Sequence, residues 1–453
     1  MSTTDERVLI EYEDGPGATS TTASRAGRVE DPAAVVAALA ASDRFGEYVM
    51  YERPGEWVFA ADAIGGVELD AHELRVAWDG RTTTSPWSGR PAEVIDRALA
   101  ALPLSGRNAY GWIGFEFCAW SLAATEHLPE RAPLAHLMVP RIEVCIDATG
   151  VRISGATPDE VADIHELIAA AQGSALPQAR PADITIDPTA YRDRVAAAVG
   201  EIRDGKYQKV ILSRKVDLPF VVDVPATYRL GRANNTPARS FLLRLGALQA
   251  AGFSPELVAS VDGDRVVTTE PLAGTRAFGR GPEADRAARA DLVSDPKEIV
   301  EHAISVQTSF AEIAAVAVPG TTAVSDFMAV RERGSVQHLA STVRGRLDTG
   351  RTSWDALEML FPSVTASGIP KRDGVDAVFR LDHDPRGLYS GAVVTVSPTG
   401  ALEATLVLRA IYQTADGAWL RAGAGIVAQS TPDREFEETC EKLGSVAPYV
   451  VEA

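Results

Sequence analysis

Cysteine is scarce in this chain: only Cys118, Cys145 and Cys440 occur among 453 residues. They are too few and too scattered for a disulfide framework, and no C-x-x-C pair has the spacing of a structural zinc site. The seven histidines form no H-x-x-x-H or similar ligand pattern either. The sequence therefore predicts reduced thiols and no zinc centre.

Positive charge is also in short supply. The 44 Lys and Arg residues face 62 Asp and Glu residues, so the formal net charge is −18. A field of this sign repels nucleic-acid backbones and anionic membrane surfaces, which makes both partners unfavourable. It repels anionic small molecules as well, so binding one requires a local arginine, lysine or metal ion.

Long apolar runs are missing, since no stretch of 18 apolar residues occurs. Residues 1–15 carry acidic side chains where a signal peptide needs a basic stretch and an apolar core. We therefore expect a cytoplasmic protein without membrane contact. With 46% hydrophobic and 23% charged residues, the composition is typical of a globular protein and excludes a disordered or fibrous one.

Several common catalytic motifs are absent too. The chain has neither a G-x-S-x-G elbow nor a Walker loop. Residues 423–428 match the loose dinucleotide fingerprint, but the next predicted helix begins only at Thr431, outside the motif. This spacing disfavours nicotinamide binding, because the true fingerprint places a helix N-terminus on the pyrophosphate. A glycine-rich strand end can still bring backbone N–H groups to an anion.

The patterns that are present indicate consecutive strands with separate helices between them, and no repeat of fixed period. This arrangement favours an α+β fold with large antiparallel sheets over alternating βαβ units. Residues 1–25 read as a flexible leader and residues 173–188, with three prolines, as a linker or crossing segment. Tyr110–Phe117 and Ala404–Gln413 are each predicted to form one strand.

Two predicted helices each begin with a capping residue followed by proline, and each carries two glutamates three residues apart. These glutamates are Glu298 and Glu301 after Asp295-Pro296, and Glu435 and Glu438 after Thr431-Pro432. Residues three apart share a helix face, so the four carboxylates could converge on one divalent ion such as Mg²⁺. The alternative is that Glu298 is a capping-box acid and Glu301 a solvated surface residue.

Three isolated cationic side chains are further candidates for the functional site, namely Lys209, Arg409 and Lys442. Most lysines are solvated or paired with an acid. Arg409 lies within the apolar segment LVLRAIY. Because a buried guanidinium is costly unless it is paired, Arg409 must have a partner or bind a ligand.

Seven segments in the second part of the chain carry a resemblance. They are Gln208–Arg214, Phe253–Glu256, Thr269–Arg276, Lys297–His302, Phe361–Lys371, Arg386–Gly391 and Glu435–Lys442. In this order they resemble the chorismate-utilising enzymes, which include anthranilate, aminodeoxychorismate, isochorismate and salicylate synthases. The amino-acid sequences of these segments are most similar to those of the salicylate synthases of mycobactin-type siderophore assembly. The likeness covers nearly the whole chain and is densest after Pro188.

The resemblance implies a fold and a domain organisation. It implies a single large α+β domain in which two antiparallel β-sheets are sandwiched with helices outside. Residues 26–187 would then be woven into the same fold as the chorismate-binding catalytic region, residues 188–453, and the proline-containing segment would connect parts of one domain.

The resemblance also implies ligands and roles. Chorismate and isochorismate are the small-molecule ligands and Mg²⁺ is the cofactor, with Glu301 and Glu438 as direct metal ligands and Glu298 and Glu435 acting mostly through water. The implied substrate-binding set is Gly274, Thr275, His338, Thr365, Tyr389, Arg409, Gly423, Ala424, Gly425 and Lys442. Lys209 is implied as general base and Glu256 as general acid.

In this mechanism Lys209 activates the water that adds at C2, while Glu256 protonates the departing 4-hydroxyl group. Isochorismate results, and loss of pyruvate with hydrogen transfer inside the substrate then yields salicylate. Lys209 can act as a base only if its pKa falls from about 10.4 toward neutrality. Burial beside the apolar residues 210–212 is the expected cause.

Alternatives remain open. An isochorismate synthase would stop after the addition of water, whereas anthranilate and aminodeoxychorismate synthases use ammonia and normally a glutamine amidotransferase partner. A chorismate-binding protein without activity is a further possibility. Retention of Lys209, Glu256 and the four glutamates favours an active enzyme, and the lysine at position 209 favours water as the nucleophile, without an amidotransferase subunit. The resemblance implies a monomer.

Overall fold

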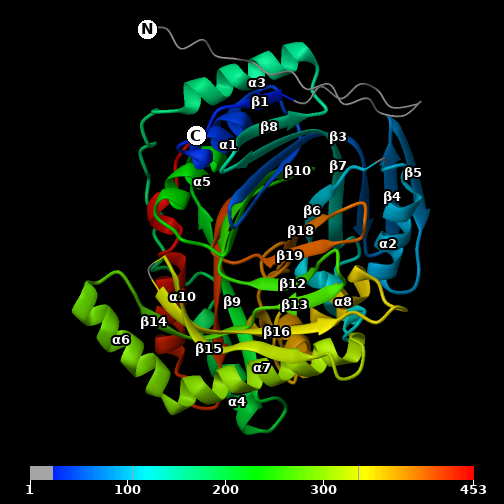
Figure 1. The fold of residues 1–453 in the computed structure, drawn as a ribbon. Helices are drawn as coiled ribbons and strands as arrows, with labels where there is room; N and C mark the ends of the chain where they lie inside the picture. Colours follow the sequence, from blue (N-terminus) through cyan, green and yellow to red (C-terminus); the bar gives the residue numbers. More distant parts are fainter. Residues whose placement is uncertain (1–23, 105, 335) are drawn as a thin grey trace.

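The computed structural model describes residues 24–104, 106–334 and 336–453 and confirms the predicted α+β class (Figure 1). All described strand pairings are antiparallel, and they form two layers. The strands of the first layer, in spatial order, are β1 (Ser24–Ala26), β8 (Gly150–Ser154), part of β7 (Pro133–Asp147), part of β3 (Glu56–Asp70), β2 (Tyr48–Arg53), β10 (Arg239–Leu245), β11 (Leu248–Ser254), β20 (Ala410–Thr414), β21 (Gly417–Ile426), β9 (Lys209–Leu218) and β17 (Gly368–Ile369).

The second layer begins at the other halves of the two long strands. Its strands, in spatial order, are β5 (Arg81–Pro86), β4 (Glu73–Trp78), β3, β7, β6 (Ala109–Ile113), β18 (Ala392–Val396), β19 (Leu402–Leu406), β12 (Leu257–Val261), β13 (Val266–Thr269), β16 (Val336–Arg346) and β15 (Ala323–Arg333). In addition, β14 (Leu272–Ala277) pairs with β16. The two expected sheets are thus joined into one hydrogen-bonded network through β3 and β7.

Alternation along the strands builds the separate cores of this sandwich. In β2, Val49 and Tyr51 belong to a core cluster formed by strands of both layers. Tyr48 and Met50, one residue out of phase, belong to a cluster that includes helix residues. Because successive side chains of a strand point to opposite faces, the apolar residues on both faces require cover on both sides.

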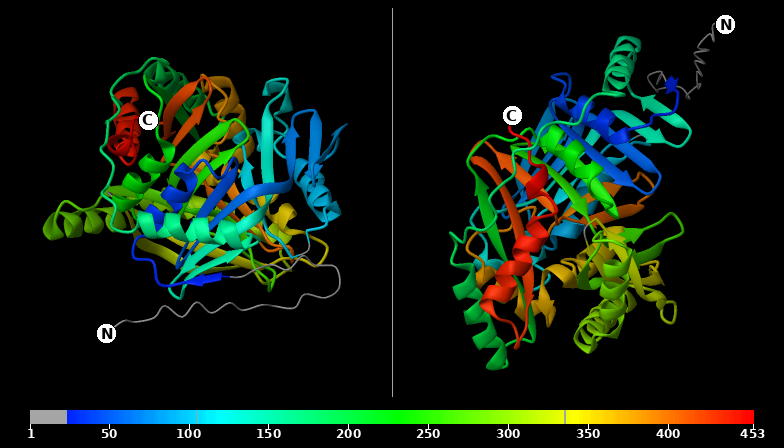
Figure 2. Two further views of the ribbon diagram at one scale, coloured as in Figure 1. Left: turned by 90° about the horizontal axis from the view of Figure 1, so that it is seen from above. Right: turned by 90° about the vertical axis from the view of Figure 1, so that its left-hand side faces the viewer.

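Helices supply that outer cover (Figure 2). Those that share a core cluster with the first layer are α1 (Pro32–Ala41), α3 (Pro158–Ala171) and α5 (Val224–Ala233). A second cluster, which joins strands of the second layer to β9 and the end of β21, includes residues of α2 (Pro91–Ala101), α4 (Tyr191–Arg203), α7 (Pro296–Val316), α8 (Ser353–Leu360) and α9 (Lys371–Leu381). Of the other described helices, α6 (Pro282–Ser294) lies beside β14, and α10 (Pro432–Leu443) lies beside β21 and contributes Phe436 and Leu443 to the two clusters.

The segment 173–188 contains no helix or strand but is held in place. The N–H groups of Arg180 and Ala182 donate to the carbonyls of Val450 and Ala447. This contact ties the segment to the C-terminal end of the chain, as a connection within one domain would be. Of the expected leader, residues 1–23 lie outside the described residues, and Ser24–Ala26 form β1.

Two strand predictions were wrong in extent. The strand expected at Tyr110–Phe117 ends at Ile113, and Phe115–Ala119 form a 3₁₀ helix. The turn is stabilised by the Glu116 carboxylate, which accepts hydrogen bonds from backbone N–H groups at Arg386 and Gly387.

Among the described residues, no helix combines the length and the apolar character needed to cross a membrane.

The second error matters for function. The strand expected at Ala404–Gln413 is broken into β19 and β20 because Arg409, between them, has a left-handed backbone with φ of +52°. Such a conformation cannot continue a strand and costs free energy for a residue other than glycine. The break turns the Arg409 side chain toward a cavity instead of leaving it in the sheet.

Candidate active site

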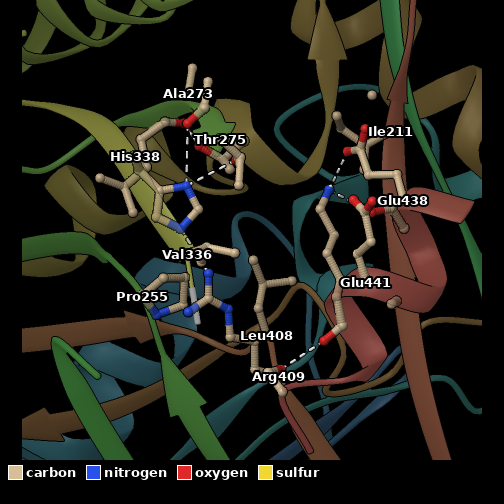
Figure 3. Close-up of a pocket in the computed structure, with 18 of the residues that line it drawn as sticks. Ile211, Pro255, Ala273, Thr275, Val336, His338, Leu408, Arg409, Glu438 and Glu441 are labelled. Atoms are coloured by element: carbon tan, nitrogen blue, oxygen red, sulfur yellow. Dashed lines mark hydrogen bonds and ion pairs between the residues drawn. The ribbon is translucent and has the colours of Figure 1, made fainter. Parts of the chain in front are cut away.

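A cavity of about 820 Å³ lies among β9, β14, β21, α7, α10 and the break before β20. All the predicted site residues except Ala424 line it. Ala424 is fully buried in the core instead, because alternation along β21 turns it to the face opposite that of its glycine neighbours. Figure 3 shows His338 and Thr275 across the cavity from Glu438.

The starts of α7 and α10 bring the four predicted glutamates to the cavity. As expected, Asp295 caps α7 through a hydrogen bond from the Lys297 N–H to its carboxylate, 2.9 Å long. Thr431 is the N-cap residue of α10 but makes no side-chain capping bond. Both helices thus open with proline in the first turn and direct carboxylates at the same space.

Three of these carboxylates form ion pairs with cationic side chains. The pairs are Glu301 with Lys209 (2.6 Å), Glu438 with Lys442 (2.8 Å) and Glu298 with Arg276 (2.9 Å). Burial would raise the pKa values of Glu301 and Glu438, but the paired lysines outweigh it and hold both below the usual value. These carboxylates are therefore ionised at neutral pH.

Glu435 differs from the other three. Its Oε2 atom is buried and has no hydrogen-bond partner among the described residues. Burial, and more weakly the charge of Glu438, raise its pKa. An unpartnered buried oxygen beside other carboxylates is a position that a cation can fill.

The side-chain chemistry of the four glutamates suits a magnesium ion. Among the described residues no group of three or more potential ligands is already gathered at metal-binding distance, because the lysines and the arginine hold the carboxylates. The ligands are nevertheless all oxygens, and Mg²⁺ usually takes only one or two carboxylates with water or substrate oxygens. Binding would require the carboxylates to exchange their present partners for the metal.

Lys209 is buried as the sequence predicts, with only 6% of its surface exposed. Its surroundings are not simply apolar, however, because the Glu301 carboxylate lies 2.6 Å from Nζ. The two groups form an ion pair. Gly425 leaves the room for this side chain, since a Cβ atom there would lie 3.0 Å from Lys209 Cε.

Glu256 lies between β11 and β12 and is only 1% exposed. Ser363 donates a hydrogen bond of 2.6 Å to its Oε1 atom, whereas Oε2 has no partner among the described residues. Burial raises the pKa of Glu256 to about 7. Unlike Glu301 and Glu438, this residue therefore has a protonated form to use at neutral pH.

Arg409 is held by neutral groups. It donates to His338 Nε2 at 2.8 Å and to the Arg333 carbonyl at 3.3 Å, and in the described part of the chain no carboxylate pairs with it. Burial lowers the pKa of Arg409 to about 10, so it stays charged at neutral pH. A buried, unneutralised guanidinium facing a cavity suits an anionic ligand.

His338 is accordingly a support for Arg409. Because a guanidinium only donates, Nε2 must accept, and the proton of the neutral ring is on Nδ1. That nitrogen lies 3.0 Å from Thr275 Oγ1 and 3.3 Å from the Gly274 carbonyl. Burial, assisted by the charge of Arg409, lowers the pKa of His338 well below its usual value.

Several lining residues were not identified from the sequence. Arg421 borders the cavity, is nearly buried and pairs with Asp382 at 3.3 Å. Its position in the apolar strand GAWLRAGAGI was the same signal that singled out Arg409. Arg276, which lines the cavity, and Ser363, which contacts Glu256 from behind the lining, lay inside quoted segments, but nothing in their spacing disclosed the side chains that they contact.

A search against family models matches residues 47–448 to the chorismate binding enzymes. The chain is 54% identical over 427 residues to a salicylate synthase of Mycolicibacterium paratuberculosis, covering 93% of this chain and 94% of the relative. It is 31% identical over 406 residues to an anthranilate synthase component 1 of Aeropyrum pernix, covering 86% of this chain and 89% of that one.

Solved structures agree on the fold. An anthranilate synthase component I from Streptococcus pneumoniae superposes with a TM-score of 0.72 at 24% identity, covering 87% of this chain and 92% of its own. The menaquinone-specific isochorismate synthase of Escherichia coli superposes with a TM-score of 0.73 at 19% identity, covering 95% and 94%.

Proposed function

The chain belongs to the chorismate-binding enzymes, and from this premise we propose that it is a salicylate synthase that converts chorismate through isochorismate to salicylate and pyruvate. One observation carries the proposal beyond the family. A single cavity contains a lysine, a glutamate with a raised pKa, an unneutralised arginine and four clustered glutamates. This combination suits acid–base chemistry on a dianionic substrate.

Binding must overcome the net charge of −18. Arg409 can bind one substrate carboxylate through its planar fork, supported from behind by His338. The residues that would hold Mg²⁺ are Glu301 and Glu438 directly, with Glu298 and Glu435 mostly through water. When bound, the ion neutralises the other substrate carboxylate and orients it.

Water addition needs a base and an acid at the same time. Lys209 must be a neutral amine to take a proton from water, so its ion pair with Glu301 has to open first. As water bonds to C2, the bond between C4 and its hydroxyl oxygen breaks. Glu256 gives its proton to that oxygen, which leaves as water.

Pyruvate elimination needs no protein base in this mechanism. The hydrogen moves within isochorismate to the enolpyruvyl group as the ether bond breaks, and the ring becomes aromatic. The contribution of the cavity is to hold the enolpyruvyl arm over the ring and to exclude water. Tyr389, which is buried, and Thr365, which is half-buried, line the cavity and are the side chains that we assign to this arm.

The test is product analysis of wild type and Lys209→Gln with Mg²⁺, each supplied with chorismate and with isochorismate. Wild type should form salicylate and pyruvate from both substrates. Lys209→Gln should fail on chorismate but still convert isochorismate, because elimination does not use the lysine. Lys206→Gln is a matched control, since Lys206 pairs with Glu201 at 3.0 Å outside the cavity.

The same chromatograms separate the alternatives. Accumulation of isochorismate would identify an isochorismate synthase, and anthranilate formed with ammonium salts would indicate an ammonia-using enzyme. Undiminished salicylate synthesis from chorismate by Lys209→Gln would contradict the role of the lysine. Supply of salicylate to a siderophore, independence from a glutamine amidotransferase, the monomeric state and a cytoplasmic location stay predictions.

A further inference from the structure

The two oxygens of the Glu256 carboxyl group have unlike surroundings. Ser363 Oγ lies 2.6 Å from Oε1, and it also accepts a bond from the Thr365 N–H at 3.3 Å. With that N–H directed at its lone pair, the serine hydroxyl hydrogen is free to point to Oε1. Oε2 is buried and has no partner among the described residues.

The main chain of Glu256 is fixed as well. Its carbonyl accepts hydrogen bonds from Thr405 Oγ1 at 3.1 Å and the Leu406 N–H at 3.3 Å, and Ser254 Oγ lies 3.0 Å away but donates over the shorter distance to the Leu406 carbonyl. The carboxyl group therefore projects from an anchored turn, and the Ser363 hydroxyl holds its Oε1 atom.

We propose that Ser363 is a positioning residue for proton donation: it makes Oε1 the accepting oxygen and leaves Oε2 to carry the proton that is delivered to the substrate. This inference rests on the proposed function, in which Glu256 is the general acid. The proton leaves Oε2 and joins the departing 4-hydroxyl oxygen as the bond from C4 to that oxygen breaks. Water departs, and Glu256 becomes a carboxylate that still accepts the hydrogen bond at Oε1.

The hydrogen bond also adjusts the acidity of Glu256. Burial is the largest influence on its pKa and raises it, and the charge of Glu270 raises it further. Ser363 is the largest influence that lowers the pKa, followed by Thr365 and the Leu272 backbone, and Arg409 is the nearby cation. Because a bond to the ionised form stabilises it, loss of the Ser363 hydroxyl should raise the pKa of Glu256 and make it a weaker proton donor.

The test compares Ser363→Ala with Ser363→Thr, which keeps the hydroxyl, in pH profiles of isochorismate and salicylate formation from chorismate. In Ser363→Ala we expect kcat to fall about tenfold with little change in KM. Activity that needs protonated Glu256 is lost as the pH rises through its pKa, so the alkaline limb should move to higher pH by about one unit. Ser363→Thr should restore both values toward those of wild type.

Ser240→Ala is the matched control, because Ser240 is also a buried serine that donates to a glutamate, Glu52, but outside the cavity. It should leave kcat and the alkaline limb unchanged. If Ser363→Ala does not fold, Ser363→Cys takes its place, since a thiol is only a weak donor.

An unchanged kcat in Ser363→Ala, or a lower kcat with an unmoved alkaline limb, would overturn the role of Ser363 while leaving the proposed function intact. A wild type that forms neither isochorismate nor salicylate would instead overturn the proposed function, and this inference with it. The two failures are therefore distinguishable in one set of assays.

Discussion

The two ends of the cavity use the same side chain in opposite ways. At the α7 and α10 end, Glu301 and Glu438 are paired with lysines, and their pKa values lie below the usual value. At the other end, Glu256 is buried without a cationic ion-pair partner, and its pKa is raised to about 7. Glu301 and Glu438 are thus anions at neutral pH, whereas Glu256 has a protonated form that could serve the proposed proton donation.

The difference shows that local environment, and not residue type, assigns the role. Burial disfavours the charged form at both ends, but only at the α7 and α10 end does a cation within 3 Å outweigh it. Separation of carboxyl pKa values within one site is a general way to divide acid and metal-binding roles. Each of the following predictions tests one side of this contrast.

The largest expected effect comes from removing a metal-side carboxylate. Glu438→Ala should abolish turnover and the binding of Mg²⁺ measured by calorimetry, while the thermal midpoint changes little. Glu437→Ala is the control, because Glu437 lies on the same helix, is 66% exposed and does not line the cavity. Full activity of Glu438→Ala, or of wild type in excess chelator, would contradict the metal assignment.

Next in size is the loss of the proton donor. Glu256→Gln keeps the shape and one hydrogen bond from Ser363 but has no proton to donate. We expect kcat for chorismate to fall by about 10² to 10⁴-fold, the range of general acid catalysis. Mg²⁺ binding should persist, unlike in Glu438→Ala. If Glu256→Gln lost Mg²⁺ binding but kept its kcat, the assignment of Glu256 as acid and Glu438 as metal ligand would be contradicted.

The contrast should also be visible in stability. Between pH 4.5 and 7, unfolding releases the Glu256 proton, because the usual pKa is 4.5 and the folded value is about 7. Stability from this group is therefore present at low pH and lost as the pH rises through 7, by about 2–3 kcal/mol between pH 5 and 8.

Urea unfolding of wild type and Glu256→Gln at pH 5 and pH 8 measures this difference. When the pH is raised from 5 to 8, the free energy of unfolding of Glu256→Gln should increase relative to that of wild type. The lysine-paired carboxylate of Glu438 has a lowered pKa, so its contribution has the opposite sign and is lost on acidification. Parallel pH dependence of wild type and Glu256→Gln would show that Glu256 is ionised in the folded protein.

The smallest expected effect concerns Arg409. Arg409→Lys keeps the charge but loses the planar fork and the contact with His338 Nε2. We expect KM for chorismate to rise about tenfold, with a smaller change in kcat. Steady-state kinetics measure the split. Unchanged kinetics would mean that Arg409 has only a structural role beside His338.

Local patterns were sufficient for much of the fold. The proline-opened helices with glutamates three apart follow from the helical period, and the continuous apolar run of β2 from a strand that is buried on both faces. The same patterns failed where distant contacts override them. The break at Arg409 and the turn around Glu116 depend on partners far along the chain, which no window of sequence contains.

The sequence by itself determined the α+β class, the candidate glutamates, the buried lysine and the need of Arg409 for a partner, because these depend on side-chain chemistry and short-range spacing. Only the tertiary structure decided that Lys209 faces Glu301, 92 residues away, and that Ser363 bonds Glu256 across 107 residues. It also turned Ala424 into the core. Protonation depends on which charge or hydrogen-bond donor lies within a few ångströms, and folding alone brings those groups together.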